Sequence, residues 1–230
     1  MREPQTVAYM TRMLSAPKLA LACLLFLPTS GGLSCDRRSA GLGAAALLLR
    51  PACATAAAPR LPLEVGFGTC CDLEPGAVDA ALEVGFRTID TAAHYGKSEA
   101  SIGDAVGRAV RRGLLASAND VRVITKIWFD DMTYAGARES IAASRAALRR
   151  DTLDVALIHF PGANDAVQDP RRNRDARAET WRALEDARAA GEVGAIGVSN
   201  FARRHLKEAF ATWRTPPEVL ALRDGESGRI

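Results

Sequence analysis

Residues 85–99 read GFRTIDTAAHYGKSE, and this stretch is the starting point for interpreting the rest of the chain. A short apolar run leads into Asp90, and Tyr95 follows five residues later in a loop of small residues. The pattern predicts a buried strand that ends at Asp90. A carboxylate and a phenol therefore lie together at the end of a strand, which raises the question of what joins them.

Outward from this stretch, short apolar runs alternate with helical patterns. The predicted strands cover 63–69, 87–90, 121–128, 153–160 and 193–201, and a sixth strand begins at 217–222. The predicted helices cover 74–85, 98–113, 134–150, 177–191 and 202–213. This alternation predicts parallel strands joined by crossover helices.

Two architectures share that alternation, the doubly wound open sheet and the closed eight-fold barrel. A dinucleotide-binding open sheet requires G-x-G-x-x-G after its first strand, and GFGTCC at 66–71 lacks the third glycine. Polar residues instead follow successive strands, which is how a barrel assembles its active site: Thr69, Asp90, Lys126, His159, Ser199 and Asn200. The sequence predicts an incomplete (β/α)8 TIM barrel of about five βα units plus a sixth strand.

The polar residues favour proton transfer to an oxygen atom. Lys126 ends an apolar strand, and a buried ammonium needs a carboxylate, for which Asp90 is the candidate. An ammonium beside a phenol lowers the phenol's pKa, so Tyr95 becomes a proton donor near neutral pH. His159 can orient a carbonyl oxygen. Each residue alone has a structural interpretation, as a cap, a packing residue or a core histidine, but together they favour catalysis.

The segments GFRTIDTAAHYGKSE, VITKIW, ALIHFP and GAIGVSNF occur in this order between about Leu61 and Phe210. Together they resemble the aldo-keto reductases, NAD(P)H-dependent enzymes on a (β/α)8 barrel. The resemblance implies that Tyr95 is the general acid, that Lys126 depresses its pKa and that Asp90 pairs with Lys126. It implies that His159 orients the substrate carbonyl.

The same resemblance implies a cofactor, NADPH, with NADH as the alternative. Ser199 and Asn200 match the family's nicotinamide contacts, Gly68 and Thr69 match its first-strand cofactor loop, and Asp90 borders the same site. Trp128 follows Lys126 closely, and two interpretations stay open for it: it lines an apolar pocket for a small carbonyl substrate, or it packs in the core. Glu99 matches an acid of the family that opens the next helix, and we interpret it as structural.

The chain departs from the family pattern after Pro217. A complete barrel needs about 250 residues, whereas residues 61–230 number 170. The family's stacking aromatic residue and the cations for the 2′-phosphate have no counterpart here. We therefore expect a C-terminally truncated barrel. Three functions remain open: reduction of an aldehyde or ketone, a nicotinamide-binding regulatory subunit, and an inactive fragment of a reductase.

The charge is unevenly distributed and divides the chain into two parts. Residues 1–60 hold seven basic and two acidic side chains, and residues 61–230 hold 23 and 25. No basic stripe interleaved with aromatics occurs in the second part, which argues against nucleic-acid binding. The run LALACLLFLP after Lys18 predicts a targeting leader, either plastid or mitochondrial or secretory, with a disordered extension and a cytoplasmic protein as the alternative. The predicted barrel is 61–230.

The cysteines predict neither a disulfide framework nor a metal site. Three of the five lie in the leader, and only Cys70 and Cys71 lie in the barrel segment. They have no metal-ligand spacing with the three histidines. We expect this pair to be small, buried apolar side chains.

Overall fold

The structure is a computed structural model that describes residues 12–13, 65–70, 73–163 and 169–222. The targeting leader predicted for residues 1–60 lies outside these residues, apart from β1 (Arg12–Met13). No helix in the described part of the chain is both long enough and apolar enough to cross a membrane.

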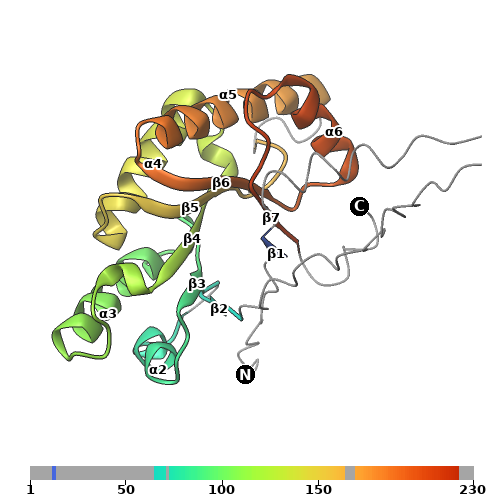
Figure 1. Ribbon diagram of the computed structural model, residues 1–230. Coiled ribbons are helices and arrows are strands. Elements are labelled where there is room, and N and C mark those ends of the chain that lie inside the picture. Colours follow the sequence, from blue (N-terminus) through green and yellow to red (C-terminus); the bar gives the residue numbers. More distant parts are fainter. Residues whose placement is uncertain (1–11, 14–64, 71–72, 164–168, 223–230) are drawn as a thin grey trace, which may run out of the picture.

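In the described part of the chain, six parallel strands form one curved sheet, with helices along its outer face (Figure 1). The strands are β2 (Phe67–Gly68), β3 (Thr88–Asp90), β4 (Arg122–Ile127), β5 (Leu153–Ile158), β6 (Val193–Ser199) and β7 (Val219–Ala221). The helices are α2 (Ala77–Glu83), α3 (Ser98–Arg111), α4 (Tyr134–Leu148), α5 (Pro170–Ala189) and α6 (Arg203–Thr212), with 3₁₀ turns η1 (Ala118–Asp120) and η2 (Phe129–Asp131).

Each parallel strand lies beside its predecessor in the chain, in the order β2-β3-β4-β5-β6-β7, and β1 pairs with β7 in the antiparallel sense. Strand, crossover helix and next parallel strand is the repeating unit of a (β/α)8 barrel. The predicted fold class, an incomplete barrel, is confirmed.

The two faces of the sheet carry different side chains because successive residues of a strand point to opposite sides. On β4, Val123 and Ile127 belong to the main core against the helices, whereas Ile124 belongs to a second cluster with Val155 and Leu157. Lys126 is two residues from Ile124 and shares its face. Lys126 therefore belongs to the concave side of the sheet.

Helix α5 begins at Pro170, seven residues before the predicted start at residue 177. Asp169 caps it, accepting hydrogen bonds from the backbone amides of Arg171 and Arg172, and Pro170 occupies the first turn. The residues 170–176 read PRRNRDA and lack an apolar periodicity, so the pattern alone does not predict them to be helical. The cap and the proline were the signal for the helix start.

Cys70 corrects the expectation for the cysteines. It is half-buried and disulfide-bonded rather than a buried apolar side chain. Cys71 lies outside the described residues.

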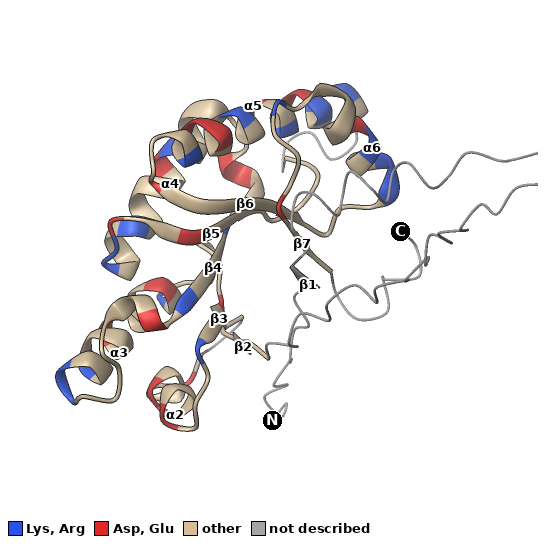
Figure 2. Ribbon diagram, viewed as in Figure 1, with Lys and Arg blue, Asp and Glu red and all other residues tan. Residues whose placement is uncertain are grey.

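Charged side chains gather on the helices, while the strands carry few of them (Figure 2). The outer layer is therefore a polar surface, and the few charges within the sheet need an explanation of their own.

Candidate active site

Three consecutive strands bring the predicted polar residues to one end of the sheet. Asp90 is the last residue of β3, Lys126 is next to last in β4, and His159 directly follows β5. All three residues are buried, between 4% and 7% exposed. Because the strands are parallel and their neighbours are in register, their carboxyl ends meet at the same edge.

Lys126 forms a buried ion pair with Asp90. Its Nζ donates to Oδ1 of Asp90 at 2.5 Å and to the carbonyl oxygen of Thr91 at 2.8 Å. Burial raises the pKa of Asp90, and the adjacent ammonium opposes this shift. The contact expected from the sequence is present.

Tyr95 lies on the loop after β3, where tight backbone hydrogen bonds turn the chain into α3. Its hydroxyl is 3.3 Å from Nε2 of His159, within hydrogen-bonding distance, and the ring tautomer decides which group donates. The ammonium of Lys126 lies 5.3 Å from the centroid of the Tyr95 ring. The phenol is thus placed between a cation and an imidazole, which answers the question raised by residues 85–99.

A group of aromatic rings borders this pair. Trp128 contacts His159 edge to face, with ring centroids 4.9 Å apart, and stacks on His94 at 4.1 Å. Phe160 stacks on His159 at 4.6 Å with a 5° angle between the rings. Trp128 was expected here from the sequence, whereas His94 and Phe160 were missed. Their signal was adjacency: each is the immediate neighbour of a predicted catalytic residue.

Ser199 is the last residue of β6 and Asn200 directly follows it, beside His159. Asn200 adopts the left-handed conformation, with φ 60°, and its Nδ2 donates to the carbonyl oxygen of His159 at 2.8 Å and to Oγ of Ser199 at 3.2 Å. A hydroxyl and an amide carbonyl side by side match the hydrogen-bonding groups of a carboxamide. These residues therefore fit the nicotinamide end of NADPH.

Gly68 and Thr69 lie at the other side of the site. Gly68 pairs in register with Asp90, and both the backbone amide and Oγ1 of Thr69 donate to the carbonyl oxygen of Asp90, at 2.9 and 3.1 Å. The structure thus places these residues beside the backbone of Asp90. Strands β3, β4 and β5 separate them from Ser199 and Asn200 on β6.

Glu99 is buried in the first turn of α3. It accepts a hydrogen bond from Oγ1 of Thr125 at 2.6 Å, and burial raises its pKa. Thr125 faces the helices on β4, so Glu99 joins α3 to the outer face of the sheet. This is a structural contact, in line with the sequence interpretation.

A hollow of about 400 Å³ lies at the opposite, amino end of the strands. It is lined by Val65, Gly85, Arg87, Thr88, Asn119, Asp120, Arg122 and Asp154. None of the predicted site residues lines it, so the chemistry and this hollow belong to different ends of the sheet. Among the described residues, no group of three or more histidine, cysteine, aspartate or glutamate side chains could hold a metal ion.

The chain belongs to the Aldo/keto reductase family, whose sequence profile matches residues 75–223. It is 34% identical over 173 residues to an NADPH-dependent codeinone reductase of Papaver somniferum, covering 70% of this chain and 53% of that protein. It is 34% identical over 178 residues to a deoxymugineic acid synthase of Zea mays, covering 72% of this chain and 56% of that one.

The solved structures agree. An aldo-keto reductase of Bombyx mori in complex with NADP matches with a TM-score of 0.59 and 30% identity, over 68% of this chain and 52% of that one. The chain spans about half the length of the curated relatives it matches.

Proposed function

We propose that this protein reduces an aldehyde or ketone to an alcohol with NADPH, and that Tyr95 is the general acid. The observation that supports this most directly is the placement of the Tyr95 hydroxyl 3.3 Å from His159, with Lys126 paired to Asp90 beneath the ring. Relatives whose names include NADPH-dependent codeinone reductase support the cofactor and the reaction class.

Each site residue has a separate role in the proposed reduction. NADPH, when bound, supplies a hydride to the carbonyl carbon. Tyr95 donates its proton to the carbonyl oxygen, and the positive charge of Lys126 stabilises the phenolate that remains. His159 holds the carbonyl oxygen near the phenol, while Asp90 keeps Lys126 charged. Ser199 and Asn200 would hold the nicotinamide carboxamide.

A tyrosine substitution tests this assignment. In Tyr95→Phe we expect carbonyl reduction to fall by roughly 10²- to 10⁴-fold while NADPH still binds, because only the donated proton is lost. The matched control is Tyr134→Phe, which removes a phenol that donates to Asp186 on the outer helices. Activity is measured by NADPH oxidation across aldehydes and ketones, and binding by fluorescence titration.

The outcomes separate the alternatives. If Tyr95→Phe turned over as fast as the unmodified chain, Tyr95 would not be the acid. If the unmodified chain bound NADPH but reduced none of the carbonyl compounds, a regulatory nicotinamide-binding subunit would be favoured instead. If it bound no NADPH, the inactive-fragment alternative would stand.

A further inference from the structure

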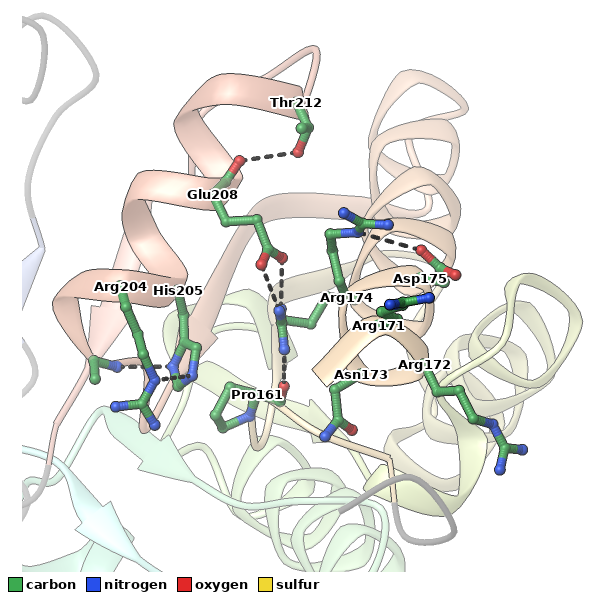
Figure 3. Close-up of polar contacts among 12 residues, drawn as sticks. Pro161, Arg171, Arg172, Asn173, Arg174, Asp175, Arg204, His205, Glu208 and Thr212 are labelled. Carbon is green, nitrogen blue, oxygen red and sulfur yellow. Dashed lines mark hydrogen bonds and ion pairs between the residues drawn. The ribbon is translucent and has the colours of Figure 1, made fainter. Parts of the chain in front are cut away.

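Arg177 is a buried cation on α5 that the proposed chemistry does not use. It is 5% exposed. Its Nε and Nη2 donate to the two carboxylate oxygens of Glu208 on α6, at 2.9 and 2.6 Å, and its Nη1 donates to the carbonyl oxygen of Pro161 at 2.5 Å (Figure 3). One guanidinium therefore joins two helices and the segment that follows His159.

The contact with Pro161 matters because of what precedes it. Phe160 lies between His159 and Pro161 and stacks flat on the His159 imidazole. Proline has no backbone N–H, so its carbonyl is the only backbone group through which hydrogen bonds can fix it. Arg177 donates a hydrogen bond to that carbonyl oxygen.

Hydrogen bonds to other elements also fix the residues that flank Phe160 and Pro161. The carbonyl oxygen of His159 accepts from Nδ2 of Asn200, and beyond Pro161 the amide of Ala163 donates to Oδ1 of Asn173 on α5. The segment from His159 to Ala163 is thus tied to β6 on one side of Phe160 and to α5 on the other. Of the two contacts with α5, the one from Arg177 to Pro161 is nearer to Phe160 in the chain.

We propose that Arg177 is a positioning residue for catalysis: through Pro161 it fixes Phe160 against His159 and so holds the imidazole at the Tyr95 hydroxyl. The importance of that imidazole rests on the proposed function. Glu208 keeps the guanidinium in place, since a buried arginine whose fork is fully paired has a single orientation.

The alternative role is purely structural, in which the ion pair only docks α6 on α5. A double variant separates the two roles. A buried ion pair can be replaced by apolar side chains of similar volume with little loss of stability. Arg177→Met/Glu208→Leu therefore restores helix packing but leaves the Pro161 carbonyl without its donor.

The experiment compares Arg177→Met, the double variant and the control Arg174→Met in the full chain. Arg174 is exposed on the same helix, 3.5 Å from Asp175. We expect kcat to fall about 10- to 100-fold in both Arg177 variants with KM unchanged, because a small displacement of a positioned group costs this much. NMR signals of the His159 ring, assigned with His159→Asn, are expected to shift in both and to stay in place in Arg174→Met.

The outcomes distinguish a positioning role of Arg177 from a purely structural one. If the double variant recovered the kcat and the His159 signals of the unmodified chain, the ion pair would only dock the helices and the proposal would be overturned. If the unmodified chain reduced no carbonyl compound, the proposed function would fail. The His159 signals would then test the positioning role of Arg177 alone: displaced signals in the Arg177 variants would support it, and unchanged signals would overturn it.

A variant that keeps the charge covers the case in which Arg177→Met does not fold. In Arg177→Lys a single ammonium faces Glu208 but cannot also reproduce the hydrogen bond from Nη1 to the carbonyl oxygen of Pro161. We expect the same His159 signals to shift, and their staying in place would overturn the proposal.

Discussion

The two ends of the sheet each hold a buried cation, and only one of them borders a candidate site. At the carboxyl end, the side chain of Lys126 is 5% exposed and pairs with Asp90. At the amino end, the side chain of Arg150 is also 5% exposed; it pairs with Asp154 and donates to the carbonyl oxygens of Ala118 and Val121.

The two cations differ in the groups that lie near them besides their carboxylate partners. Arg150 donates to two backbone carbonyls at η1 and to the carboxylate of Asp154, so it joins η1 to β5. Lys126 also lies 5.3 Å from the ring centroid of a phenol that is itself hydrogen-bonded to an imidazole. Burial and pairing are therefore common to both ends, and a third titratable group within reach distinguishes the site.

The largest effect is expected from Lys126→Met. It leaves Asp90 buried without its cation, which costs about 3–5 kcal/mol of unfolding free energy, and it removes the charge proposed to stabilise the Tyr95 phenolate. Denaturant unfolding and NADPH oxidation measure the two effects. The double variant Lys126→Met/Asp90→Asn is expected to regain stability but no activity. Equal stability of the single and double variants would mean that the unpaired Asp90 carboxylate is not the cause of the lost stability.

A smaller effect, on stability alone, is expected from Arg150→Met. It removes three hydrogen bonds, two to backbone carbonyls and one to the half-buried Asp154, at a cost of about 2 kcal/mol in unfolding free energy. The folded protein is expected to keep its activity, as measured below its unfolding midpoint. Asp79→Asn, which breaks the exposed pair with Arg108, is the control and is expected to leave the midpoint unchanged. Loss of activity in folded Arg150→Met would contradict the separation of the two ends.

The smallest expected effect is on the pH dependence of stability. The pKa of His205 is lowered from 6.5 to about 4, mainly by burial and also by the charges of Arg204 and Arg177, while Glu208 opposes the shift. Between these two values the unfolded chain binds a proton that the folded protein does not, so stability falls as the pH drops from 6.5 towards 4. His205→Gln is expected to reduce this slope in denaturant unfolding. An identical pH dependence of the two proteins would exclude His205 as a contributor.

The sequence predicted the parts of the fold that rest on local pattern. Apolar runs placed the strands, and the polar residue after each run placed Asp90, Lys126 and His159 at one edge. The Lys126–Asp90 contact followed from the cost of burying an ammonium, a rule that needs no coordinates.

Other features depended on partners distant in sequence. Arg177 lies in a stretch of charged residues typical of a solvated face, and only the approach of Glu208, 31 residues away, explains its burial. Likewise, Phe160 follows the end of β5, where strand alternation no longer fixes the direction of a side chain. The catalytic roles of the site residues stay predictions until the variants are measured.

The order of the strands has a consequence for biosynthesis. From β3 to β7, each strand pairs with one synthesised immediately before it. The sheet can therefore grow one unit at a time as the chain leaves the ribosome, with short-range contacts at every step. Asp90 meets Lys126 early in this sequence, whereas the ties from Asn200 and Glu208 arrive only when β6 and α6 emerge. His159 would thus be the last member of the site to acquire a fixed position.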